Sequence, residues 1–133
     1  APAGRPTRRR AAGRRGAGTG EPVACTPMEV PEIDVAELAR VRRDGAPLID
    51  VREPDEYVAA HVPGAELVPL ATVPDRLDDL PTDRPVYVIC AAGARSLRAA
   101  EVMRARGIDA VNVAGGTNAW IDAGFEVATG SEP

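Results

Sequence analysis

The sequence predicts an α/β domain with a central, mostly parallel sheet of about five strands and helices on both faces. Short apolar segments of strand length alternate with amphipathic segments of helix length, about every twenty residues, which is typical of βαβ units. Hydrophobic residues make up 44% of the chain and charged residues 27%, as in soluble globular proteins with a real core. A chain of 133 residues is long enough for one ordinary domain.

The first predicted elements are a helix, a strand and a second helix. Asp34 and Glu37 have the spacing of a capping box, so the first helix should start at Asp34 and stop at Asp44-Gly45. Residues 47–51 form a short apolar run that predicts a buried strand. Proline and acidic residues at the start of segment 54–61 favour a helix there.

The remaining elements continue the alternation. In chain order they are a weak strand at 67–68, a short helix over 72–80, the clearest strand at 86–89, a helix from Ser96 to Gly107, a strand at 111–113 and a helix over 117–123. Trp120 is expected to anchor the last helix in the core.

The charge distribution divides the chain into a tail over residues 1–26 and a domain over 27–133. The first twenty residues hold six arginines and no acid, among small residues that cannot offset the entropy of ordering, so we expect disorder. Nucleic-acid binding or a transit peptide is the alternative, but the tail has no interleaved aromatic residues and no apolar stripe. Cys25 is expected to have no specific role. The absence of a secretory apolar stretch makes a cytoplasmic location the expectation.

Composition excludes several classes of function. All 16 basic residues are arginine, which excludes phosphate loops, Schiff bases and general bases that depend on lysine. Aromatic residues are too sparse, at 3%, for a platform that binds single-stranded nucleic acid, and no apolar run is long enough to span a membrane. One histidine and two cysteines cannot build a disulfide framework or a four-ligand zinc site, and two free thiols suggest a reducing compartment. We therefore expect no metal, no nucleic-acid partner and no membrane partner.

Three unusual segments fall at the carboxyl ends of predicted strands, where parallel sheets bind ligands: Asp50-Val51-Arg52, the loop from Cys90, and Gly115-Gly116. Small residues let the Cys90 loop curl so that its backbone N–H groups point inward, and the next helix adds its positive end. The Cys90 thiol should then ionise below the usual pKa of about 8.5 and act as a nucleophile.

Each of these residues also has a structural interpretation. A cysteine at a strand end is commonly a small buried hydrophobe, although the loop and helix around Cys90 favour a functional role. Arg95 is either directed at a bound anion or a surface charge, and the Asp50/Arg52 pair is equally compatible with a structural ion pair. His61 could form a Cys-His pair, but the rigid turn that follows it favours a structural role.

Five motifs together resemble the single-domain rhodaneses over residues 30–126. They are Leu48-Ile49-Asp50-Val51-Arg52-Glu53, Glu56-Tyr57, His61-Val62-Pro63-Gly64-Ala65, Cys90-x-x-Gly93-x-Arg95-Ser96, and Gly115-Gly116 with Ala119-Trp120. The resemblance implies a rhodanese-like fold and a sulfurtransferase that moves sulfane sulfur through a Cys90 persulfide. Thiosulfate or a persulfide would be the donor and a thiol, cyanide or a sulfur-carrier protein the acceptor, without a cofactor.

The same resemblance implies the site. Cys90 is the catalytic residue, and the substrate-binding residues are Ala91, Ala92, Gly93, Ala94, Arg95, Ser96, Asp50 and Arg52. Related phosphatases have five residues between the catalytic cysteine and arginine, whereas residues 91–94 number four here, which favours sulfur over phosphate. The loop lacks the cation found in many thiosulfate-using members, so the donor stays open. A Cys-dependent phosphatase and a non-catalytic interaction module are the alternatives.

Overall fold

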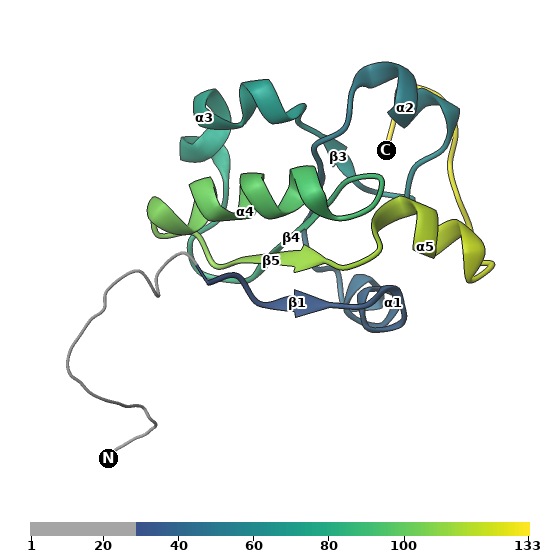
Figure 1. The fold of residues 1–133 in the computed structure, drawn as a ribbon, viewed down its shortest axis with the longest axis horizontal. Coiled ribbons are helices and arrows are strands. Elements are labelled where there is room, and N and C mark those ends of the chain that lie inside the picture. Colours follow the sequence, from purple (N-terminus) through teal and green to yellow (C-terminus); the bar gives the residue numbers. More distant parts are fainter. Residues whose placement is uncertain (1–28) are drawn as a thin grey trace, which may run out of the picture.

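A computed structural model describes residues 29–133, which form a sheet covered by helices on both faces (Figure 1). The tail predicted over residues 1–26 and its Cys25 lie outside the described residues. No helix within residues 29–133 has the length and apolar character needed to cross a membrane.

The sheet contains five parallel strands in the order β1-β5-β4-β2-β3 among the described residues (Figure 1). They are β1 (Glu32–Ile33), β2 (Leu48–Asp50), β3 (Glu66–Leu67), β4 (Val86–Ile89) and β5 (Ala110–Val113). This arrangement confirms the predicted fold class. The sequence named four of these strands and missed β1, because two residues are too few to show any periodicity. β1 exists through its pairing with β5, in which Glu32 lies opposite Asn112.

The helices also follow the predicted order, with differences at their ends. They are α1 (Val35–Arg43), α2 (Pro54–Ala59), α3 (Val73–Arg76), α4 (Ala94–Ala105) and α5 (Gly116–Asp122), with 3₁₀ turns η2 (Leu70–Thr72) and η3 (Leu77–Asp79) around α3. The single helix predicted over 72–80 is thus three short pieces. The prediction that α4 starts at Ser96 was wrong by two residues. Gly93, with φ at 112°, turns the chain directly into the helix.

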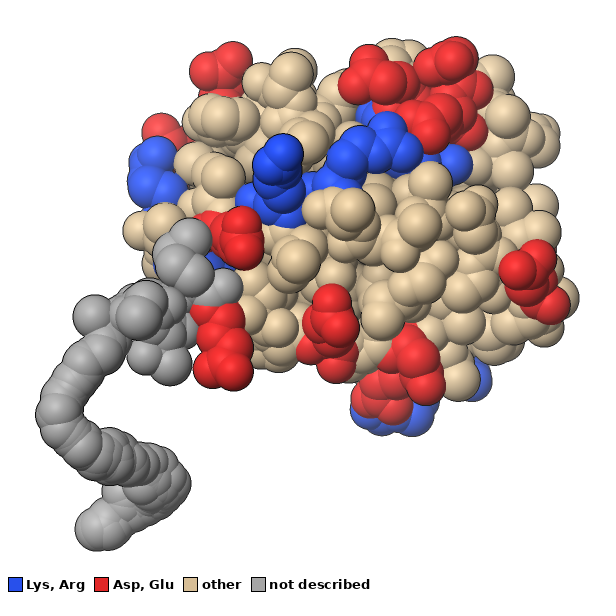
Figure 2. Space-filling model, viewed as in Figure 1, with Lys and Arg blue, Asp and Glu red and all other residues tan. Residues whose placement is uncertain are grey.

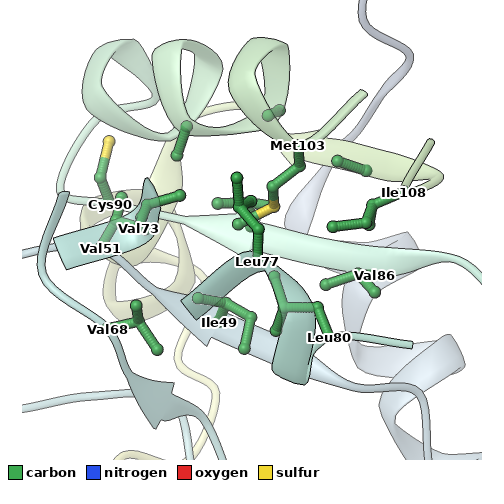
Figure 3. Close-up of a cluster of buried hydrophobic side chains, with 14 residues drawn as sticks. Ile49, Val51, Val68, Val73, Leu77, Leu80, Val86, Cys90, Met103 and Ile108 are labelled. Carbon is green, nitrogen blue, oxygen red and sulfur yellow. The ribbon is translucent and has the colours of Figure 1, made fainter. Parts of the chain in front are cut away.

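Two hydrophobic clusters cover the two faces of the sheet. Val88 of β4 belongs to the cluster beneath α3 and α4, where Met103 is fully buried (Figure 3). Ile89, the next residue, belongs to the opposite cluster with Leu38 of α1 and Trp120 of α5. This alternation places the residue after Ile89, which is Cys90, on the α4 face.

Candidate active site

Cys90 is the first residue after β4, and its side chain is 1% exposed. Its sulfur points toward α4 and away from the aliphatic side chains of the cluster (Figure 3). Sγ accepts a hydrogen bond from the backbone N–H of Gly93 at 3.1 Å and one from the hydroxyl of Ser96 at 3.3 Å. The loop therefore turns polar hydrogens toward the sulfur, as the sequence predicts.

The environment of Cys90 lowers the pKa of its thiol. Burial is the largest single influence and acts to raise that pKa. It is outweighed by hydrogen bonds from the hydroxyl and backbone of Ser96 and from the backbone of Gly93 and Ala92. These donors stabilise a sulfur anion, so the thiol is suited to nucleophilic attack.

The amino end of α5 holds the backbone of the Cys90 loop. The N–H of Thr117 donates to the carbonyl oxygen of Cys90 at 2.8 Å, and that of Asn118 donates to the carbonyl of Ala91 at 3.0 Å. A Cβ atom at Gly116 would overlap both of these carbonyl groups. The glycine pair that the sequence placed at this edge of the sheet thus allows two backbone segments to approach closely.

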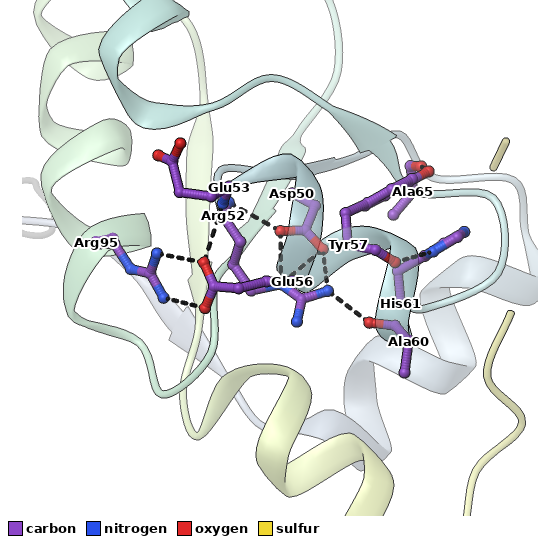
Figure 4. A network of polar contacts seen from close by, with 9 residues as sticks. All are labelled: Asp50, Arg52, Glu53, Glu56, Tyr57, Ala60, His61, Ala65 and Arg95. Carbon is purple, nitrogen blue, oxygen red and sulfur yellow. Dashed lines mark hydrogen bonds and ion pairs between the residues drawn. The ribbon is translucent and has the colours of Figure 1, made fainter. Parts of the chain in front are cut away.

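Arg95 lies in the first turn of α4 and forms an ion pair with Glu56 of α2 (Figure 4). Its Nη1 and Nη2 atoms donate to the two carboxylate oxygens at 2.8 and 3.0 Å. Hydrogen bonds from Arg95 and from the backbone of Glu53 lower the pKa of Glu56 to about 2. Arg95 therefore carries a carboxylate partner, and its charge is not directed at the loop alone.

The Asp50/Arg52 pair is buried behind the site. Arg52 donates from Nε and Nη2 to the Asp50 carboxylate, and its Nη2 donates to the carbonyl oxygen of Ala60 at 2.7 Å (Figure 4). The Asp50 side chain is fully buried and that of Arg52 is 7% exposed. These contacts connect the end of β2 to the end of α2. They agree with the interpretation of Asp50 and Arg52 as a structural ion pair.

His61 and Trp120 have structural partners. The ring of His61 stacks on Tyr57 with centroids 3.7 Å apart, and its Nδ1 donates to the Tyr57 carbonyl oxygen (Figure 4). Trp120 is buried and donates from Nε1 to the carbonyl oxygen of Glu126. Both observations agree with the roles expected from the sequence.

Sequence reasoning missed two residues near the loop as parts of the site. Glu56 appeared only within a motif, although its spacing from Glu53 matches the capping box that the structure shows. Asn112 is a fully enclosed polar side chain in the otherwise apolar strand β5, and it accepts a hydrogen bond from Ser96. The sequence signal that could have identified Asn112 was a single polar residue within the apolar strand sequence Ala-Val-Asn-Val.

Arginine side chains cross the face of the molecule on which α4 lies, and carboxylates gather at its α2 end (Figure 2). α4 itself contributes Arg95, Arg98 and Arg104. Arg95 is paired with Glu56 and Arg104 with Asp109, so Arg98 is the arginine of α4 for which the described residues supply no ion-pair partner.

Comparisons with known proteins agree with this geometry. The family model described as Rhodanese-like domain matches residues 34–123. Among curated relatives from Bacillus subtilis, YqhL, an uncharacterized protein, is 42% identical over 76 residues, and the putative sulfur carrier protein YrkF is 40% identical over 74 residues. These matches cover 56% and 55% of this chain, but only 60% of YqhL and 40% of YrkF.

Other relatives match over nearly their whole length. The putative sulfurtransferase YtwF of Bacillus subtilis is 34% identical over 95 residues, which is 70% of this chain and 92% of YtwF. A crystal structure of a rhodanese-like domain protein from Staphylococcus aureus is 36% identical, with a TM-score of 0.68. That alignment covers 75% of this chain and all of the Staphylococcus protein.

Proposed function

Since this chain belongs to the rhodanese-like domain family, we propose that it is a sulfurtransferase in which Cys90 carries sulfur as a persulfide. The observation that carries the proposal is the position of Sγ, which accepts hydrogen bonds from Gly93 and Ser96. The names of relatives such as YtwF, a putative sulfurtransferase, support the same role.

The reaction consists of two displacements at sulfur. The Cys90 thiolate attacks the outer sulfur of a donor R–S–SH, forms the new S–S bond and expels R–S⁻. The persulfide formed on Cys90 lies where the inward N–H groups of Ala92 and Gly93 stabilise negative charge. A thiophilic acceptor then attacks the outer sulfur, and Cys90 leaves as the thiolate.

The charges around the loop favour a persulfide donor over thiosulfate. Ala91, Ala92 and Ala94 are neutral, and Arg95 is the cation that the loop sequence supplies. Glu56 already neutralises Arg95 through two hydrogen bonds. Thiosulfate brings two negative charges and so requires more positive charge than a low-molecular-weight persulfide.

A sulfur-carrier protein or a thiol is the proposed acceptor. The similarity to YrkF, a putative sulfur carrier protein, supports a partner of this class. Arg98, the α4 arginine without an ion-pair partner among the described residues, would attract an acidic group of such a partner to this face (Figure 2).

Intact mass spectrometry of the full chain tests this function. After incubation with glutathione persulfide we expect the mass of one added sulfur atom, mapped to Cys90, and less uptake from thiosulfate. Cys90→Ser should abolish the uptake, whereas Cys25→Ser, the matched control, should retain it. A parallel assay with p-nitrophenyl phosphate addresses the phosphatase alternative. Phosphate release without sulfur uptake would replace the proposal by the phosphatase alternative. If the protein showed neither activity, a non-catalytic interaction module would be favoured.

A further inference from the structure

Two buried polar side chains, Asn112 and Ser96, connect the exposed Glu32 on the edge strand β1 to Cys90. The Ser96 hydroxyl lies 3.3 Å from Cys90 Sγ and 2.5 Å from the side-chain oxygen of Asn112. Ser96 is fully buried and Asn112 is 1% exposed, so no bulk water replaces a missing partner. A hydroxyl carries one proton and donates to one acceptor at a time. Asn112 and Cys90 therefore compete for the same proton.

Glu32 sets the orientation of the Asn112 amide. The register of β1 and β5 places Glu32 opposite Asn112, so both side chains lie on the same face of the sheet. Asn112 Nδ2 donates to Glu32 Oε2 at 2.8 Å and to the carbonyl oxygen of Gly93 at 3.3 Å. Because an ionised carboxylate only accepts hydrogen bonds, the NH₂ group must face Glu32 and the amide oxygen must face Ser96.

We propose that Asn112 is a positioning residue that withholds the Ser96 proton from the Cys90 thiolate and so favours the sulfur-loaded form of the loop. The proposal rests on the proposed persulfide chemistry. When Cys90 is a thiolate, the Ser96 proton turns to Sγ and leaves the Asn112 oxygen buried without a donor, which is costly. In the persulfide the negative charge lies on the outer sulfur, and the Ser96 proton returns to Asn112.

The change of hydrogen-bond partner by Ser96 requires no proton transfer between residues. When the acceptor attacks the outer sulfur, the S–S bond breaks and its electron pair stays on Cys90 Sγ. The O–H bond of Ser96 rotates from Asn112 to the new thiolate and remains intact. Removing the outer sulfur therefore costs the buried hydrogen bond from Ser96 to the Asn112 oxygen, and this cost favours the sulfur-loaded form.

Charged groups from four elements surround the loop: Arg95 on α4, Glu56 on α2, Glu32 on β1, and Asp50 with Arg52 at the end of β2. All of them are retained in the variants below, so differences in Cys90 ionisation between these variants report on Ser96 and Asn112.

A double-mutant cycle on the full chain tests the competition, in a Cys25→Ser background that leaves one thiol. The rate of alkylation by iodoacetamide against pH gives the Cys90 pKa. Ser96→Ala should raise this pKa because the thiolate loses a donor. Asn112→Ala should lower it, increasing the ratio of thiolate to thiol at a fixed pH roughly three- to tenfold. In the Ser96→Ala background Asn112→Ala should have a much smaller effect, since no shared proton remains and only the 3.3 Å hydrogen bond to the Gly93 carbonyl oxygen is lost.

Two results would overturn the proposal. The first is that Asn112→Ala raises the Cys90 pKa or leaves it unchanged. The second is that Asn112→Ala lowers the Cys90 pKa by the same amount in the parent and in the Ser96→Ala background. Asn112→Val provides a second variant with the same expected sign, in case the alanine variant does not fold by circular dichroism. The ratio of sulfur-loaded to thiolate protein in a mixture of glutathione and its persulfide should fall in Asn112→Ala by a similar factor. If the parent takes up no sulfur, the proposed function fails, and the pKa cycle still decides the role of Asn112.

Discussion

Glu56 holds the guanidinium of Arg95 by two hydrogen bonds, although 39 residues separate them in the chain. The pair joins α2 to the first turn of α4, directly beside the loop that starts at Cys90. A cation in the first turn of a helix is unfavourable by itself, because that end of the helix is already positive. The carboxylate offsets this repulsion and reduces the charge that Arg95 offers to an incoming anion.

Glu56→Gln should therefore increase the use of thiosulfate. Removing the carboxylate charge leaves Arg95 to attract the dianion, and we expect kcat/KM for thiosulfate to rise about tenfold, the factor that corresponds to about 1.4 kcal/mol. The value for glutathione persulfide should change much less. Glu37→Gln is the matched control, because Glu37 pairs with Arg40 on α1, whose Leu38 packs in the cluster on the sheet face opposite α4. A proportional change for both donors would contradict a role of this ion pair in donor choice.

The same carboxylate makes stability depend on pH. The pKa of Glu56 is about 2 in the folded protein, against an ordinary value of 4.5, so its contribution to folding is complete above about pH 4.5. That contribution is lost as the pH falls toward 2. Between pH 6 and pH 2, urea unfolding should show that the parent loses about 0.5–1 kcal/mol more stability than Glu56→Gln does. An equal loss in both proteins would mean that the pair adds nothing to folding.

The Asp50/Arg52 pair should act on stability more than on catalysis. Asp50→Ala leaves the buried guanidinium of Arg52 without its counter-charge and should cost about 3–5 kcal/mol in the free energy of unfolding. The double variant Asp50→Leu/Arg52→Met removes both charges and should recover most of that loss. We expect it to retain persulfide formation in the mass assay. A folded double variant without sulfur uptake would place Arg52 among the residues that contact the donor.

Gly116→Ala should disturb the Cys90 loop itself. Alanine at φ 59° costs about 1–2 kcal/mol from the left-handed backbone alone, and its Cβ would also overlap the carbonyl groups of Cys90 and Ala91. Gly107→Ala is the matched control, since Gly107 has φ at 86° with open space around it. Thermal unfolding should show a loss in both variants and a larger one for Gly116→Ala. Sulfur uptake should fall in Gly116→Ala only; unchanged uptake would show that the loop does not depend on this contact.

The elements that the sequence predicts well are those whose pattern is local. β4 begins and ends where predicted, because an apolar run lies between Pro85 and small residues. α1 starts at its Asp34 cap, whose side chain accepts from the N–H of Glu37. β1 was not predicted, and the helix predicted over 72–80 is divided into η2, α3 and η3, since pairing and packing with distant segments decide both features.

The candidate site divides in the same way. The loop from Cys90 to Ser96 is one continuous segment, and its small residues, glycine and following helix by themselves determined that N–H groups would surround a thiol. The partners of that segment come from α2, β5 and α5, and only the tertiary structure decided that Glu56 neutralises Arg95 and that Asn112 accepts a hydrogen bond from Ser96. The physical reason is that backbone geometry follows from neighbouring residues, whereas the charge and hydrogen bonds at a site depend on side chains brought together by the fold.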